Sequence, residues 1–181
     1  NNRITSTIPW LPCERIDALV WISKSEACLI TDDLEAAPLR GMGLRAAGAS
    51  ELRMSDAPIA MRWKNPQAAH RARARARLST ASLLLGVLRH SCDFSREYAR
   101  ERQAFGRPIA HHQALAFMIT EMQMALDGSR LLIHEAAWHI DSGRPAGLLA
   151  ASAFAQCIES ARFIGPDGVQ ILGGHGFMAD Y

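Results

Sequence analysis

The chain has 181 residues, of which 49% are hydrophobic and 21% are charged, and its formal net charge is +2 at neutral pH. An apolar fraction near one half excludes a disordered chain, because it is enough to bury a core. The small net charge provides no bulk attraction to nucleic acid or to anionic lipid. The length favours about one domain, or one domain plus a piece of another, and no apolar run approaches the roughly 18 residues of a membrane span.

The four cysteines, Cys13, Cys28, Cys92 and Cys157, lie at long and irregular spacings. Without a CxxC pair they predict neither a disulfide framework nor a zinc knuckle. Reduced, mostly buried thiols are therefore expected, and they fit a cytoplasmic protein. The seven histidines are scattered without metal-ligand spacing, so we predict no metal site.

The first third of the chain has the patterns of β-strands. Residues 4–8 alternate apolar and polar side chains, which is the period of a half-buried strand. Residues 17–22 and 27–31 are short apolar runs. Only residues 23–26 separate them, so the spacing predicts a hairpin.

A proline and several glycines between residues 38 and 48 predict a connection rich in loops. Residues 51–54 alternate again and predict another strand. The chain begins inside a strand-like stretch, and an open edge there would be an unpaired template. We therefore expect residues 1–63 to form part of an antiparallel sheet or barrel belonging to a truncated domain.

The remainder has the patterns of long helices. Residues 67–103 contain no proline, and their apolar positions recur with helical spacing. Gly106 and Pro108 are expected to end this helix, with the glycine in the left-handed position after it. A second helix is predicted over about 110–142.

A third helix is predicted over about 146–164, with Pro166 breaking or kinking it. Long helices joined by short loops form antiparallel bundles. The expected fold class is therefore α+β, with a partial antiparallel β-barrel or sheet followed by an up-down α-helical bundle.

Two segments carry a specific resemblance. Residues 98–109 read YARERQAFGRPI and are followed by HQA at 112–114, while residues 170–177 read QILGGHGF. Their order and spacing resemble the acyl-CoA dehydrogenase family. The resemblance covers 66–181 as most of the C-terminal helical domain, and more weakly 1–63 as the later part of the middle β-domain. In that middle domain the matching motifs include residues 41–45.

The resemblance implies FAD as cofactor and an assembly of subunits. By resemblance, Arg102, Phe105 and Gln113 contact the FAD of a neighbouring subunit. An arginine held at a helix end beside a tight turn suits this task, because a guanidinium can bind phosphate oxygens bidentately. Other matching positions form a second cofactor patch and the aromatic wall beside the flavin. They are Gln170, Gly173 and Gly174 for the patch, and Trp10 for the wall.

The resemblance also implies α,β-desaturation of an acyl-CoA thioester, with hydride transfer to the flavin. Arg77 matches an arginine that helps to shape the acyl-CoA site, although Ala74 stands where an acidic residue is expected three positions earlier. The reaction needs a carboxylate base. The alternative family position for that base is Ala76 here, and the usual one would follow Tyr181, so we expect an incomplete chain without its catalytic base.

Alternative interpretations remain at this point. The chain could be a non-catalytic subunit that lends its Arg102 patch to a paralogous partner, instead of part of a dimeric or tetrameric enzyme. A helical nucleic-acid-binding protein would use the alternating arginines of residues 71–77. That run lacks interleaved aromatic residues, so the expected partners are an acyl-CoA substrate and further subunits, with no nucleic acid and no membrane.

Overall fold

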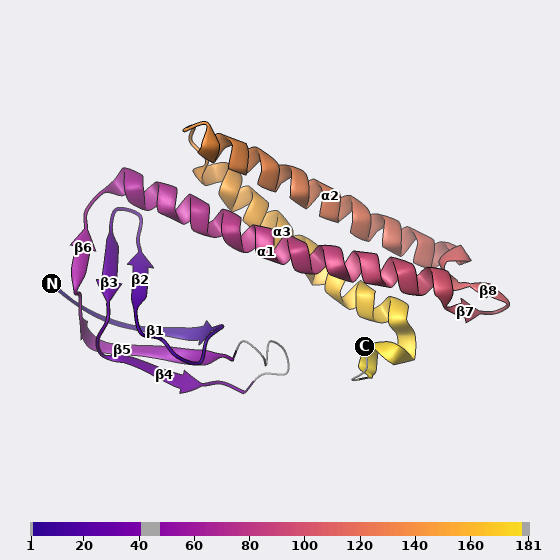
Figure 1. Cartoon of the computed structure of the whole chain (residues 1–181), viewed down its shortest axis with the longest axis horizontal. Coiled ribbons are helices and arrows are strands. Elements are labelled where there is room, and N and C mark those ends of the chain that lie inside the picture. The colour runs from indigo at the N-terminus through magenta and orange to yellow at the C-terminus, as the bar shows by residue number, and fades with distance from the viewer. Residues whose placement is uncertain (1, 41–47, 179–181) are drawn as a thin grey trace. The chain divides into compact units, whose positions relative to one another are not determined.

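The computed structural model describes residues 2–40 and 48–178. The chain divides into two compact units, Asn1–Ala72 and Arg73–Tyr181, and the boundary falls within the first turns of helix α1 (Figure 1). Strands make up most of the first unit, and helices make up most of the second. The α+β class is thereby confirmed, while residues 41–45 lie outside the described residues.

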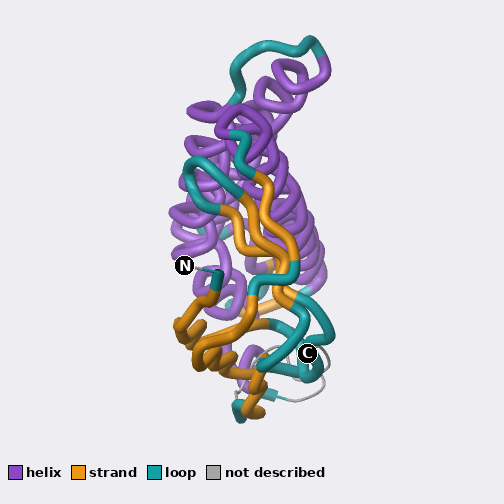
Figure 2. Tube along the Cα trace, turned by 90° about the vertical axis from the view of Figure 1, so that its left-hand side faces the viewer, coloured by secondary structure: helices purple, strands orange, loops and turns teal. Residues whose placement is uncertain are grey.

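The β unit contains two antiparallel sheets. One has the order β1-β5-β4 and the other β2-β3-β6, and Figure 2 shows these strands as separate orange tracks. The strands are β1 (Arg3–Leu11), β2 (Leu19–Ile22), β3 (Ala27–Ile30), β4 (Leu34–Pro38), β5 (Ser50–Pro58) and β6 (Met61–Trp63). In the described part of the unit the sheets do not close into a barrel, so the sheet alternative is the correct one.

The predicted β2–β3 hairpin is confirmed, with Trp21 opposite Cys28 and the Ser23 N–H donating to the Glu26 carbonyl at 2.9 Å. The alternation predicted for residues 4–8 is also present, because Ile4, Ser6 and Ile8 are less exposed than Thr5 and Thr7 between them. The two short strands β4 and β6 were not predicted. The core of the unit consists of Cys28, Ile30, Leu52, Met54, Ala57 and Ile59.

The helical unit consists of long helices packed along one another (Figure 1). They are α1 (Pro66–Glu101), α2 (Gln113–Asp141) and α3 (Gly147–Leu172), and the short 3-10 turns η2 (Ile109–His111) and η3 (Gly173–Phe177) follow α1 and α3. Their shared core draws on all three helices and on η2. It is formed by Leu88, Cys92, Ala99, Ile109, Met122, Leu126, Ile164 and Ile171.

The end of α1 differs from the sequence prediction. The helix ends at Glu101, and Phe105 and Gly106 instead form the tip of a small hairpin between β7 (Gln103–Ala104) and β8 (Arg107–Pro108). Both tip residues have positive φ, 54° and 78°. A two-residue hairpin with the right-handed strand twist requires this backbone, so the glycine serves the hairpin and not the helix end.

Pro166 was expected to break or kink the third helix near residue 164, yet α3 continues through it to Leu172. A proline removes one helical N–H, but buried side chains on both sides hold the segment. Ile164 is 0% exposed and Ile171 is 3% exposed. Burying these groups outweighs the lost hydrogen bond.

Helices α2 and α3 also share a buried hydroxyl chain. The Ser129 hydroxyl donates to the Ala125 carbonyl at 2.8 Å, so the Ser160 hydroxyl donates to Ser129 at 3.1 Å. The Gln156 amide in turn donates to Ser160 at 3.3 Å. Each buried hydroxyl therefore has its partners, which avoids the cost of an unpaired polar group.

Within the described ranges 2–40 and 48–178, no helix is both long and apolar enough to cross a membrane.

Candidate functional site

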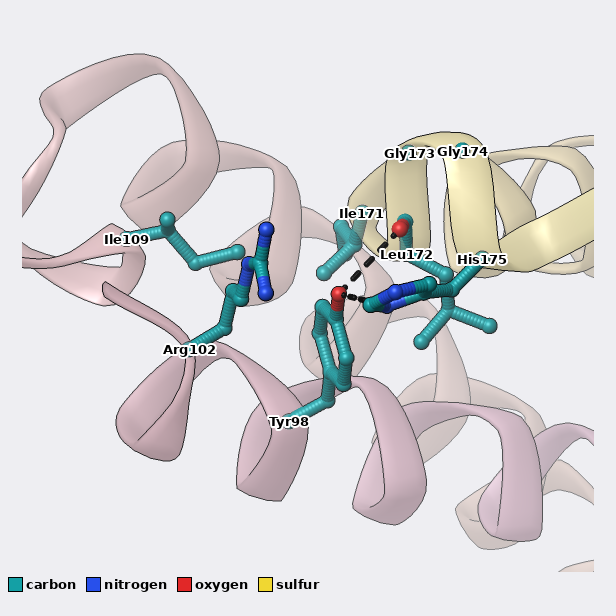
Figure 3. A pocket seen from close by; sticks show the side chains of 8 residues that line it. All are labelled: Tyr98, Arg102, Ile109, Ile171, Leu172, Gly173, Gly174 and His175. Carbon is teal, nitrogen blue, oxygen red and sulfur yellow. Dashed lines mark hydrogen bonds between the residues drawn. The ribbon is translucent and has the colours of Figure 1, made fainter. Parts of the chain in front are cut away.

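A pocket of about 280 Å³ lies at the end of the helical bundle where α1 and α3 finish (Figure 3). Arg102 and Tyr98 contribute side chains from the α1 side. Residues 171–175 contribute the end of α3 and the start of η3. The structure thus brings together three of the predicted site residues, Arg102, Gly173 and Gly174. The complete lining is Tyr98, Arg102, Ile109, Ile171, Leu172, Gly173, Gly174 and His175.

Arg102 is held by its backbone on both sides. Its N–H donates to the Tyr98 carbonyl at 2.8 Å, and its own carbonyl accepts from the Ile109 N–H at 2.8 Å. Ile109 is buried in the bundle core. These hydrogen bonds fix the backbone from which the Arg102 side chain extends. A guanidinium on a fixed backbone is suited to binding an anion in a defined direction.

Glycine stands at positions 173, 174 and 176 for different structural reasons. Gly173 has φ 59° and ψ −130°, a conformation that L-residues rarely adopt, and it terminates α3. A Cβ at Gly176 would lie 2.6 Å from the Val169 carbonyl oxygen, so the fold itself requires that glycine. A Cβ at Gly174 would meet no atom of the chain within 4 Å. Gly174 thus lines the pocket and has open space where a side chain would stand.

Tyr98 and His175 form the contact across the pocket floor. The Tyr98 hydroxyl donates to the Leu172 carbonyl at 3.3 Å and lies 2.7 Å from His175 Nδ1. The two rings meet edge to face at 5.9 Å. Figure 3 shows both hydrogen bonds and the Arg102 guanidinium beside them.

Phe105 extends from the β7–β8 hairpin and is 95% exposed. A non-glycine residue with positive φ is strained, and such strain is often found at functional sites. The hairpin is braced by His112, whose Nε2 lies 3.3 Å from the Ala104 carbonyl and whose Nδ1 lies 3.3 Å from Arg107. An arginine only donates, so Nδ1 accepts and Nε2 carries the proton.

Other predicted site residues lie outside the pocket lining. Gln113 is the exposed first residue of α2, and Gln170 is exposed in the last turn of α3. Trp10 is 48% exposed on β1 of the other unit. Arg77 is half-buried in α1.

The arginine run of residues 71–77 occupies the start of α1. Arg71 and Arg75 are exposed, whereas Arg73 and Arg77 are half-buried. Alternate residues of a helix lie about 200° apart around its axis, so the run does not form one basic stripe.

Sequence reasoning did not select Tyr98, His112 and His175 as site residues. Tyr98 lies four residues before Arg102, and this spacing could have predicted that the two side chains are neighbours. The roles of the two histidines depend on which groups form hydrogen bonds with their ring nitrogens. The spacing of residues in the sequence does not predict those partners.

The lining of the pocket contains one guanidinium and no carboxylate among the described residues. Open backbone at Gly174 stands opposite that cation. Such an arrangement suits an anion that needs close backbone approach, such as a phosphate or pyrophosphate. In the described residues no group of three His, Cys, Asp or Glu side chains could hold a metal ion.

Two buried thiols have shifted acidities. Burial raises the pKa of Cys157, although a hydrogen bond with Ser129 opposes this. Burial and the neighbouring Asp93 carboxylate raise the pKa of Cys92. Both groups therefore stay as thiols at neutral pH, and neither has the lowered pKa of a nucleophilic cysteine.

These shifts predict a loss of stability in alkaline solution. Because the folded thiols have raised pKa values, the unfolded chain loses these protons first as pH rises above the ordinary thiol pKa. The free energy of unfolding should be independent of both thiols at pH 7 and should fall as the pH rises past the ordinary thiol pKa. Denaturant titrations of the parent and Cys157→Ala measure this, and an equal alkaline decline in both proteins would contradict the assignment for Cys157.

The fold and the pocket together define an α+β protein whose helical bundle ends in a pocket lined by one guanidinium and a glycine pair. The profile described as "Acyl-CoA dehydrogenase, C-terminal domain" matches residues 67–181. The chain belongs to this family, as the two sequence motifs predicted.

Two curated relatives show the range of proteins that the chain resembles. It is 37% identical over 105 residues to a 3-(aryl)acrylate reductase of Clostridium sporogenes, and 38% identical over 105 residues to the probable acyl-CoA dehydrogenase YngJ of Bacillus subtilis. Each match covers 58% of this chain and 28% of the relative.

Solved structures extend the similarity to the β unit. A chain of the ChsE4-ChsE5 complex from Mycobacterium tuberculosis matches with a TM-score of 0.85 and 25% identity, over 99% of this chain and 51% of that one. PigA with FAD and proline matches with a TM-score of 0.74 and 25% identity, over 86% of this chain and 43% of that one. This chain thus spans about half the length of these solved chains.

Proposed function

We propose that the chain is the C-terminal part of an FAD-dependent oxidoreductase acting on acyl-CoA thioesters, and that its bundle-end pocket binds the FAD pyrophosphate. The observation that carries the proposal is the meeting of Arg102 with the Gly173–Gly174 backbone in one pocket. Family membership and the FAD named with PigA support the choice of cofactor.

The residues present fit such a group. The guanidinium supplies charge-assisted donors, and the open space at Gly174 admits close approach of phosphate oxygens. Phe105, which projects from the hairpin and is 95% exposed, would contact the same cofactor where it is carried by a neighbouring subunit. Gln113 and Gln170 lie outside the pocket lining and would add polar contacts to FAD, and Trp10 of the β unit would stand beside a flavin.

When bound, the flavin would supply the hydride acceptor for α,β-desaturation of the thioester, or the hydride donor for the reverse reduction. Both directions occur among the names of the relatives, which include dehydrogenases and reductases. Arg77 would contribute to the acyl-CoA site. We assign no catalytic base to this chain.

The absorbance spectrum of the purified full-length protein tests the proposal. We expect the flavin bands, or their appearance when the apoprotein is reconstituted with FAD. A colourless protein that takes up no FAD would contradict the proposal.

A change at Gly174 separates cofactor contact from folding. Gly174→Ala adds a methyl group that meets no atom of the chain, so the thermal unfolding midpoint should stay within the small range of neutral surface changes. FAD affinity should fall roughly tenfold or more, because the methyl group occupies the space that a phosphate would approach.

Gly86→Ala on α1 is the matched control, since its Cβ also meets nothing within 4 Å. The control should leave FAD affinity unchanged. Equal FAD affinity for Gly174→Ala and the parent, measured by fluorescence titration, would argue against phosphate contact at this glycine.

A second candidate is a non-catalytic subunit that contributes the same pocket to a partner's FAD. This second candidate is supported by the similarity to a chain of the ChsE4-ChsE5 complex, which has two named components. Purification from its source distinguishes the two. A homomeric, active protein supports the enzyme, whereas activity that requires a co-purifying paralogue supports the subunit.

A further inference from the structure

We propose that Tyr98 and His175 form a clamp that positions the Gly173–Gly174 backbone opposite Arg102 and so sets the width of the anion pocket. The inference rests on the proposed function, because it assigns these residues a positioning role toward the same pyrophosphate. They are positioning residues, since the reacting end of the flavin lies away from the phosphates.

The end of α3 is joined to α1 by a side-chain hydrogen bond. The last carbonyls of a helix have no helical partner and need another donor. The Tyr98 hydroxyl provides one to Leu172, the final residue of α3, at 3.3 Å. This hydrogen bond connects α1 to the residue directly before the glycine pair.

The proton on His175 follows from the contacts of the Tyr98 hydroxyl. The Leu172 carbonyl only accepts, so the Tyr98 hydroxyl donates its single proton to that carbonyl at 3.3 Å. Within the proposal we therefore assign the proton of the 2.7 Å contact between Tyr98 and His175 to Nδ1 of the imidazole. His175 follows Gly174 directly, so both ends of the glycine pair are attached to the same hydroxyl.

Gly173 and Gly174 have no side chains with which to hold their own backbone in place. Gly173 has a backbone conformation open mainly to glycine, and neither glycine would have its Cβ within 4 Å of another part of the chain. A side chain at either position would therefore have no neighbour to pack against. The contacts at Leu172 and His175 hold the residues on both sides of the pair, and Arg102 lies four residues after Tyr98 on the α1 side of the pocket (Figure 3).

Tyr98→Phe tests the clamp in the full-length protein, with binding of FAD to the apoprotein as the readout. Loss of one hydroxyl should weaken binding roughly tenfold. If the hydroxyl acts by positioning the glycines against Arg102, the two residues are coupled. Tyr98→Phe should then weaken binding less than about twofold in an Arg102→Ala background. Equal losses in both backgrounds would overturn the proposal.

Replacements of His175 provide a second readout. The asparagine amide nitrogen can take the place of Nδ1, whereas the glutamine amide nitrogen takes the place of Nε2. His175→Asn should retain FAD affinity within about threefold of the parent, and His175→Gln should lose it to the extent of Tyr98→Phe. Equal affinities for the two variants would contradict the clamp.

Nitrogen-15 NMR of the ligand-free protein tests the tautomer without any cofactor. We expect the His175 proton on Nδ1, and a shift toward the Nε2 form in Tyr98→Phe. A parent protein with the proton on Nε2 refutes the clamp even where FAD binds. A parent that binds no FAD but shows the Nδ1 proton contradicts the proposed function alone.

Discussion

Arg102→Ala should release most of the FAD that the parent protein retains. The guanidinium is the cationic side chain of the pocket lining. A hydrogen bond to a charged group contributes about 1.5–3 kcal/mol, which corresponds to a loss of affinity between about tenfold and a hundredfold. Fluorescence titration of the apoprotein measures the change.

Arg100→Ala is the matched control, because Arg100 stands two residues earlier and is exposed beside Glu97 at 3.6 Å. An exposed pair of this kind contributes little. The control should bind FAD as the parent does and unfold at a similar temperature. Parallel losses of FAD in both variants would indicate a general charge effect and would count against a specific contact by Arg102.

Ile164→Ala should produce a large loss of stability in the helical unit. Ile164 is 0% exposed and belongs to the core that α1, α2 and α3 share. Removing its side chain leaves a cavity and should lower the free energy of unfolding by about 2–5 kcal/mol.

Leu148→Ala provides the comparison on the same helix, since Leu148 is 80% exposed. Its effect should lie within about 0.5 kcal/mol, the usual range for surface changes. Chemical denaturation monitored by far-ultraviolet circular dichroism follows both variants. A small loss for Ile164→Ala would contradict the role given to this core position in holding α3 together around Pro166.

Helical periodicity predicted the buried face of α1 correctly, because side chains three and four residues apart share a face. Leu88, Cys92 and Ser95 are all buried there. The prediction that Pro166 breaks the third helix was wrong, because α3 continues to Leu172 with Ile164 and Ile171 buried on either side of the proline. Local propensity does not include that tertiary contribution.

Short strands were harder to predict than long helices. Strand β4 begins directly after Asp33, which has a positive φ of 56°, and pairs with β5. In the sequence, Asp32 and Asp33 indicate the end of the preceding strand, and the residues that follow do not alternate strongly enough to predict β4. Its existence depends on pairing with β5, which is a contact between separate segments.

The candidate site was partly predictable. The motifs selected Arg102 and the glycine pair, and the structure brings them to one pocket. The Tyr98–His175 contact was not predicted, because it joins residues 77 positions apart through a hydroxyl and a ring nitrogen. Such contacts depend on how α3 ends against α1.

The structure of the full-length protein with FAD is the most direct test of the central claim. We expect pyrophosphate oxygens at hydrogen-bonding distance, about 3 Å, from the Arg102 guanidinium and beside the Gly173–Gly174 backbone of the same chain. An FAD whose pyrophosphate is bound elsewhere, with this pocket left to solvent, would contradict it.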